Sequence, residues 1–151
     1  MVNYTPETRG MKKESTTTDV LAKDIMQKSF VQLKESQVTA EAAQTLLDYK
    51  LPGAPVVNEA GELTGFISEK DCLHRVIKSR YLNTPSIPIS EYMSTELVTV
   101  SPEDNLFYVV ELFTRHPYHC YPVVENNTCV GLIYRHNCLK ATMENYRRGY
   151  A

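Results

Sequence analysis

Two short motifs, which occur together twice, decide the fold of this chain. The first copy is APVV at residues 54–57 followed by GFISEKD at residues 65–71, and the second is YPVV at residues 121–124 followed by GLIYRHN at residues 131–137. The proline motifs lie 67 positions apart and the glycine motifs 66, so the second copy has one residue less in its turn. Solenoid repeats usually span about 20 to 50 residues. This longer period therefore indicates two copies of a small globular fold.

Each copy has the same order of predicted elements around these motifs. A short alternating apolar run predicts a strand at residues 30–33 and again at residues 97–100. A helix follows in each copy, because apolar residues recur there on one helical face, at Val38, Ala42, Ala43, Leu46 and Leu47 and at Leu106, Val109, Val110 and Phe113. We expect Ser36 and Asp104 to be the N-caps of these two helices.

The two motifs then supply a hairpin and the start of a final helix, near Ser68 in one copy and near Tyr134 in the other. The predicted fold class is mixed α+β, with two tandem β-α-β-β-α repeats. A unit of about 60 residues buries little apolar surface alone, so we expect the repeats to pack with pseudo-two-fold symmetry. The expected segments are a flexible N-terminal arm at 1–20, repeats at 21–80 and 90–145, a linker at 81–89 and a tail at 146–151.

Composition excludes several classes of protein. The chain has 151 residues, 42% of them hydrophobic, and a net charge of -2, which gives little support to nucleic-acid binding. No apolar run approaches the roughly 18 residues that a membrane span needs, and the N-terminus lacks the apolar region of a secretory signal. The four cysteines form no CxxC motif. We therefore expect a cytoplasmic protein with reduced thiols and no membrane partner.

The order and duplication of these motifs resemble the CBS domain, a module named for cystathionine β-synthase that occurs in tandem pairs. The resemblance covers roughly residues 22–145, so the chain resembles a free-standing pair. It implies a regulatory module that binds an adenine-containing small molecule: AMP, ADP, ATP, S-adenosylmethionine or NAD. It also implies a homodimer, a regulated partner protein and no catalytic activity.

In the family, the last residue of an S/T-x-x-D pattern holds the ribose of the ligand. The resemblance therefore implies that Asp71 binds the ribose here, with Ser68 as a smaller donor and acceptor beside it. A carboxylate offers two acceptor oxygens to two neighbouring hydroxyls. The same pair also fits a capping box, in which the two side chains only satisfy the start of a helix. Both interpretations are open at the level of sequence.

The resemblance implies that the rest of this cleft comes from both repeats. The expected residues are Phe66, Ile67, Leu97, Val98, Tyr118, His119, Cys120, Tyr121 and Pro122. The candidate phosphate ligands are Lys70, His74, Arg75, Arg115, His119, Arg135 and His136. Each apolar member of the cleft also fits a plain core position.

The second cleft departs from the family pattern, because Tyr134 and Asn137 replace the serine and the aspartate. An amide has one carbonyl acceptor and no charge, so we expect this cleft to hold a ribose less firmly. Its other expected residues are Phe30, Val31, Pro52, Gly53, Ala54, Leu132 and Ile133.

Two alternatives stay open. His116, His119 and Cys120 offer ligands for a metal or a haem, although their spacing matches no standard zinc motif. A ligand-independent dimerisation scaffold would have the same fold. An enzyme is disfavoured, because the sequence contains no P-loop, no GxSxG motif and no GxGxxG motif.

Overall fold

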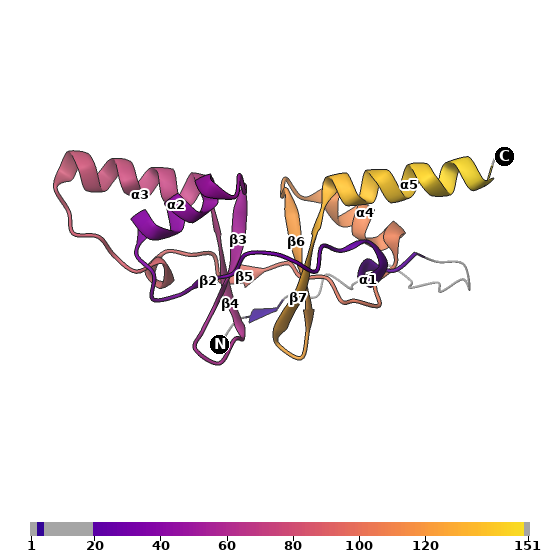
Figure 1. The fold of residues 1–151 in the computed structure, drawn as a ribbon, viewed down its shortest axis with the longest axis horizontal. Helices are drawn as coiled ribbons and strands as arrows, with labels where there is room; N and C mark the ends of the chain where they lie inside the picture. The colour runs from indigo at the N-terminus through magenta and orange to yellow at the C-terminus, as the bar shows by residue number, and fades with distance from the viewer. Residues whose placement is uncertain (1–2, 5–19, 150–151) are drawn as a thin grey trace. The chain divides into compact units, whose positions relative to one another are not determined.

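The computed structural model describes residues 3–4 and 20–149, which form two compact units. Residues 31–97, together with 3–4, make up unit 1, and residues 20–30 with 98–149 make up unit 2 (Figure 1). The expected mixed fold is confirmed, because each unit combines a β-hairpin with two helices of at least ten residues.

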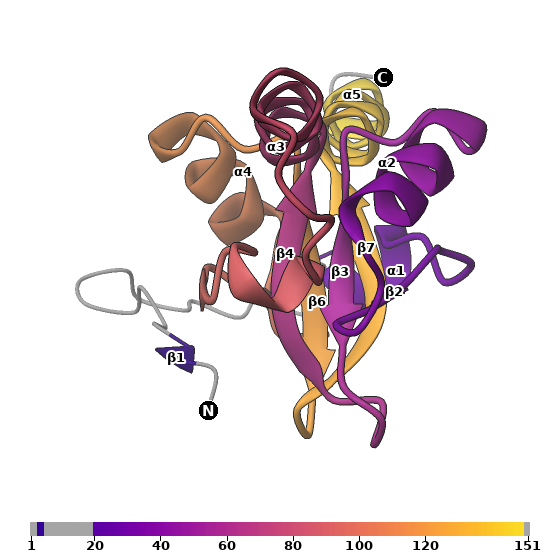
Figure 2. The same cartoon turned by 90° about the vertical axis from the view of Figure 1, so that its left-hand side faces the viewer.

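Unit 1 is built on a three-stranded sheet in the order β2-β3-β4. Strand β3 pairs parallel with β2 and antiparallel with β4. The elements are β1 (Asn3–Tyr4), β2 (Leu33–Lys34), α2 (Thr39–Asp48), β3 (Gly53–Val57), β4 (Leu63–Ser68), α3 (Glu69–Leu82), the 3-10 helix η1 (Ile89–Glu91) and β5 (Glu96–Leu97). Helices α2 and α3 lie at the end of the hairpin opposite its turn (Figures 1 and 2).

Unit 2 repeats this plan around the antiparallel hairpin of β6 and β7. Its elements are α1 (Ala22–Ile25), α4 (Leu106–Arg115), β6 (Cys120–Glu125), β7 (Thr128–Tyr134) and α5 (Arg135–Gly149). Within the described residues, no helix is both long and apolar enough to cross a bilayer.

Each unit has its own hydrophobic core. In unit 1, β3 is buried throughout and β4 alternates between buried and half-buried residues, as expected for a strand with one face on the core. Helix α2 adds Ala42 and Leu46 to this core, whereas Leu47 is 66% exposed and does not belong to the predicted face. In unit 2, the core residues of α4 are Leu106, Tyr108, Val109 and Leu112.

The first long helix of each copy, and the first strand of the first copy, begin later than the sequence predicted. Strand β2 begins at Leu33, and α2 has Val38 as its N-cap in place of Ser36. The N-cap of α4 is Asn105, whose Oδ1 accepts from the backbone N–H of Tyr108 at 2.9 Å. The neighbouring Asp104 instead accepts from the N–H of Ser101 at 2.8 Å. Asp104 and Asn105 are both residue types that cap helices, and in the structure Asn105 is the cap while Asp104 binds the preceding turn.

The start of the second copy also differs, because β5 covers only Glu96–Leu97 and pairs parallel with Asn3–Tyr4. Val100 forms a separate bridge to Val123. The expected flexible arm lies outside the described residues apart from 3–4 and 20, and the expected tail is helical as far as Gly149.

The segments that precede the first strand of each repeat are exchanged between the units. Met26 from the start of the first repeat packs on Gly131 in unit 2, and Met93 from the start of the second packs on Gly65 in unit 1. Reciprocal backbone hydrogen bonds join Gln27 to Leu132 at 2.7 and 3.0 Å. The boundaries of the two spatial units therefore differ from those of the two sequence repeats. Residues 21–30 belong to the first repeat but to unit 2, and residues 90–97 belong to the second repeat but to unit 1.

The missing side chain of Gly131 makes room for this exchanged segment. A Cβ at Gly131 would lie 2.6 Å from the Sδ of Met26 and 3.0 Å from the carbonyl oxygen of Gln27. We expect Gly131→Val to destabilise the protein by about 1–3 kcal/mol, the usual cost of overpacking, and to expose the Gln27 amide in hydrogen exchange. Thr128→Val, at an exposed position of the same strand, is the control. Equal melting temperatures for the two variants would contradict this packing.

Candidate ligand-binding site

The candidate site is the junction where β4 ends at Ser68 and α3 begins at Glu69. Ser68 pairs with Gly53 across the hairpin, and the N–H of Glu69 donates to the carbonyl of Pro52 at 2.9 Å. The first turn of α3 is therefore held directly on the sheet. Its position does not depend on a loop.

Ser68 and Asp71 form a capping box at this junction. The Oδ2 atom of Asp71 accepts from the backbone N–H of Ser68 at 2.9 Å and from its hydroxyl at 2.8 Å, while the Ser68 hydroxyl accepts from the N–H of Asp71 at 3.1 Å. The capping interpretation of this motif thus holds in the structure. Among the described residues, no donor binds the Oδ1 atom of Asp71, so the carboxylate keeps an acceptor that the cap does not use.

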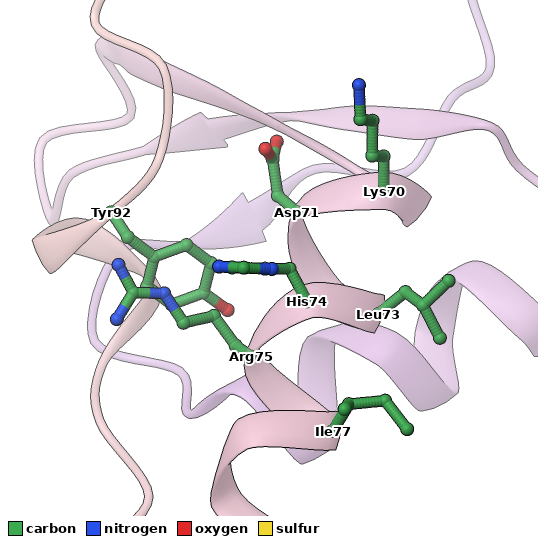
Figure 3. A pocket seen from close by; sticks show the side chains of 7 residues that line it. All are labelled: Lys70, Asp71, Leu73, His74, Arg75, Ile77 and Tyr92. Atoms are coloured by element: carbon green, nitrogen blue, oxygen red, sulfur yellow. The ribbon is translucent and has the colours of Figure 1, made fainter.

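Asp71 also lines a cavity of about 560 Å³ that lies wholly within unit 1. This volume falls in the range of about 300–1,000 Å³ that is typical of small-molecule sites. The lining residues are Lys70, Asp71, Leu73, His74, Arg75, Ile77 and Tyr92 (Figure 3). The predicted ribose ligand is therefore next to a space that a small molecule could enter.

Three of the predicted phosphate ligands line this cavity with Asp71. Lys70, His74 and Arg75 come from the first two turns of α3, and in Figure 3 the ammonium of Lys70 lies on the same side of the helix as the Asp71 carboxylate. Arg75 and His74 project toward Tyr92. The cavity combines one carboxylate with two fixed positive charges and a histidine.

Tyr92 is a residue of the cavity that sequence reasoning missed. The guanidinium of Arg75 lies 4.6 Å from the centre of its ring, a cation–π contact. The Tyr92 hydroxyl is 2.7 Å from the Oγ1 of Thr39, and burial raises the pKa of this phenol. Tyr92 follows η1, some twenty positions after Asp71, so no helical spacing in the sequence connects the two residues.

The other residues of the expected first cleft are distributed over both units. Phe66, Ile67 and Leu97 belong to unit 1, and Val98, Tyr118, His119, Cys120, Tyr121 and Pro122 belong to unit 2. Several of them are core residues of their own unit. Ile67 is fully buried, and Tyr121 is 1% exposed with its hydroxyl donating to the carbonyl of Leu112 at 2.8 Å. A cleft that joins Asp71 to residues of unit 2 stays a prediction.

The corresponding junction in unit 2 keeps only part of the capping box. The Oδ1 of Asn137 accepts from the backbone N–H of Tyr134 at 2.9 Å, as the Oδ2 of Asp71 does from Ser68. The hydroxyl and the negative charge of the first copy have no counterpart here. Burial raises the pKa of the Tyr134 phenol to about 12, so this side chain is neutral near pH 7.

The remaining residues of the expected second cleft are also found in both units. Phe30, Leu132 and Ile133 belong to unit 2, and Val31, Pro52, Gly53 and Ala54 belong to unit 1. Gly53 lies against Phe66 of the neighbouring strand, because a Cβ at Gly53 would be 2.6 Å from the ring. A second cleft assembled from these residues stays a prediction as well.

The histidines proposed for a metal or haem have other contacts. His116 stacks on Tyr118 with ring centres 5.5 Å apart, and the Nδ1 of His119 accepts from the guanidinium of Arg135 at 2.9 Å. In the part of the chain that the structure describes, no three His, Cys, Asp or Glu side chains come together as a metal site. The geometry therefore gives this alternative no support.

The four cysteines are free and buried. Burial raises the pKa of the Cys120 thiol to about 12 and the pKa values of Cys72, Cys129 and Cys138 to about 11. Because the thiolate is the reactive form of cysteine, these side chains act as small core residues rather than as nucleophiles at neutral pH.

Comparison with known proteins agrees with this architecture. The chain is 31% identical over 130 residues to the CBS domain-containing protein YhcV of Bacillus subtilis, covering 85% of this chain and 90% of YhcV. It is also 30% identical over 126 residues to the A-adding tRNA nucleotidyltransferase of Aquifex aeolicus. That match covers 83% of this chain but only 15% of the enzyme.

Two solved structures share the fold. CBSX2 in complex with AMP has a TM-score of 0.73 at 21% identity, over 83% of this chain and 98% of that one. The CBS domain pair of MJ0100, in complex with 5′-methylthioadenosine and S-adenosylmethionine, has a TM-score of 0.71 at 21% identity, over 84% of this chain and 98% of that one. The family model of the CBS domain matches residues 22–78 and 89–144. With two matched repeats, the chain belongs to the CBS-domain family.

Proposed function

We propose that this protein is a regulatory module that binds an adenine nucleotide and has no catalytic activity of its own. The observation that carries the proposal is the position of Asp71, at the start of α3 and on the wall of a cavity of about 560 Å³. The family supports it, because two related CBS pairs have been solved with AMP or with S-adenosylmethionine and 5′-methylthioadenosine.

The chemistry of the cavity suits the parts of such a ligand. The unused Oδ1 of Asp71 can accept from a ribose hydroxyl while Oδ2 maintains the cap. Lys70 and Arg75 provide positive charge for a phosphate. Leu73, Ile77 and the ring of Tyr92 provide apolar surface. The candidate ligands are AMP, ADP, ATP, S-adenosylmethionine and NAD.

The same cavity is next to a surface suited to a second copy of the chain. Leu73 and Ile77 are 65% and 47% exposed on α3, and the corresponding Leu139 and Met143 are 64% and 43% exposed on α5. Exposed apolar residues that recur together favour a partner surface. We propose a homodimer through these helices. Since Leu73 and Ile77 also line the cavity, a bound ligand would change the surface that the dimer uses.

Ligand binding would then act by shifting the equilibrium of this dimer, or of a complex with a regulated partner protein. A ligand shifts such an equilibrium only by its different affinities for the two states. Free, buried cysteines are compatible with the expected cytoplasmic location.

Asp71→Asn tests the ribose contact. Asn137 shows that an amide can accept the capping bond in this fold, so the variant should stay folded while it loses the charge. We expect isothermal titration calorimetry to show adenine-nucleotide affinity reduced at least about tenfold, since hydrogen bonds to a charged group contribute about 1.5–3 kcal/mol. Asn105→Ala, which removes the N-cap of α4 in unit 2 and leaves the cavity residues unchanged, is the control. If AMP, ADP, ATP, S-adenosylmethionine and NAD all fail to bind the wild type, a scaffold function is favoured instead.

Asn137→Ala tests the asymmetry of the two repeats. We expect it to change nucleotide affinity by less than about threefold, because Asn137 lacks the charge that strengthens a hydrogen bond. The two variants are compared in the same calorimetric titration. An equal loss of affinity for Asn137→Ala and Asp71→Asn would show that both repeats contribute a site.

Leu73→Ser tests the dimer surface. We expect its dimer dissociation constant, measured by sedimentation equilibrium, to rise more than about tenfold, because burial of a leucine contributes about 1.5–3 kcal/mol. Leu82→Ser is the matched control. Leu82 is equally exposed on α3, but nine residues later and therefore on the opposite face of the helix. Equal dissociation constants for the two variants would place the dimer contact elsewhere.

A further inference from the structure

A second cavity of about 440 Å³ lies at the other end of α3, within unit 1. Helix α3 ends at Leu82, and the left-handed conformation of Asn83, with φ of 51°, turns the chain back. Residues 84–87 then form one wall of the cavity, the last turns of α3 form another, and Thr39 and Ala40 at the start of α2 close it. Figure 1 shows the chain leaving the far end of α3 and returning toward η1.

The charges on this cavity all have the same sign. Arg75, Lys78 and Arg80 are among its twelve lining residues, and none of the twelve is acidic. Within the described part of the chain, these three side chains form no ion pair. This concentration of positive charge contrasts with the net charge of -2 of the whole chain.

The acidic residues of α3 can offset the charge of Arg75, because Asp71 is four residues away on the same helix, but they are distant from Lys78 and Arg80. Glu69 and Asp71 are at the N-terminal end of the helix. Asp71 and Arg80 are nine residues apart, which corresponds to about 14 Å along a helix, and exposed charges are screened beyond about 8 Å at physiological salt. Glu41 of α2 follows Ala40 in sequence but does not line the cavity.

The uncharged residues of the cavity also suit an anion. Four residues that carry hydroxyl groups line the cavity with the three cations: Thr39, Ser79, Thr84 and Ser86. Two of these hydroxyls form hydrogen bonds within the protein. The Oγ of Ser79 donates to the carbonyl oxygen of Thr84 at 3.0 Å, and the Oγ1 of Thr39 lies 2.7 Å from the hydroxyl oxygen of Tyr92. Among the described residues, the side-chain hydroxyls of Thr84 and Ser86 have no hydrogen-bond partner and can donate to a ligand.

We propose that this second cavity binds a phosphate chain of two or more phosphates, at a site separate from the Asp71 cavity. A chain of several phosphates offers oxygens to each of the three cations that line the cavity, and the cavity is small enough to favour a small molecule. Val76, Leu82 and Ile87 add apolar surface. The chain can therefore be that of a free inorganic polyphosphate or that of a nucleotide.

Arg75 lines both cavities, and the ring that it contacts, Tyr92, lines the Asp71 cavity. A test of the second site must therefore use residues that line it alone. Lys78 and Arg80 meet this condition, and both are exposed, so their replacement should leave the fold intact.

The test is calorimetric titration of the full chain with tripolyphosphate, ATP and adenosine. The variant is the double substitution Lys78→Gln and Arg80→Gln, and the matched control is Lys140→Gln with Arg147→Gln, which removes the same charge from α5. We expect tripolyphosphate affinity to fall at least about tenfold in the variant and by less than about twofold in the control.

Two further measurements separate this site from the Asp71 site. Adenosine, which has no phosphate, should bind the double variant as it binds the wild type, and Asp71→Asn should leave tripolyphosphate binding unchanged. Equal affinities for ATP and tripolyphosphate would identify the phosphate chain alone as the ligand, whereas tighter ATP binding that the double variant loses would show that the nucleoside also contacts this site. The proposal is overturned if tripolyphosphate does not bind the wild type, or if variant and control lose affinity equally.

Discussion

The capping box between Ser68 and Asp71 is the interaction on which the site depends. It joins the last residue of β4 to the first turn of α3, at a point where Ser68 also pairs with Gly53 across the hairpin. An N-cap contributes about 1 kcal/mol to stability, so the two residues serve the fold whether or not a ligand binds. The ligand role requires only the second oxygen of the carboxylate. One side chain can thus stabilise a helix and bind a ligand, because its two oxygens act independently.

The two repeats show what this fold retains when one site changes. Both copies keep the antiparallel hairpin, and in both the side chain at the third helical position accepts from the backbone N–H where the helix begins. Asn137 lacks the charge of Asp71. Tyr134 lacks the short side-chain hydroxyl with which Ser68 takes part in the capping box. The packing of each repeat tolerates these differences, because the helix start needs only one acceptor. In our account the duplication therefore supplies the scaffold, and sequence divergence limits strong ribose binding to unit 1.

Much of the fold could be predicted from the sequence because it depends on local patterns that occur twice. Proline-valine-valine and the glycine motif predicted the hairpins, and helical periodicity predicted α2 and α4. Contacts between distant segments could not be predicted in this way. Nothing near Met26 indicates that it packs on Gly131, more than a hundred positions later, and nothing near Tyr92 indicates its contact with Arg75. In the candidate site, Asp71 and the charged residues that follow it on α3 were accessible to sequence reasoning, whereas the aromatic wall was not.

The central claim is that Asp71 holds a ribose from the cavity of unit 1. A crystal structure of the protein with AMP tests it most directly. We predict that the Oδ1 of Asp71 lies within 3.2 Å of a ribose hydroxyl, a distance typical of a hydrogen bond, while Oδ2 keeps its bonds to Ser68. A nucleotide bound with its ribose away from Asp71 would contradict the account.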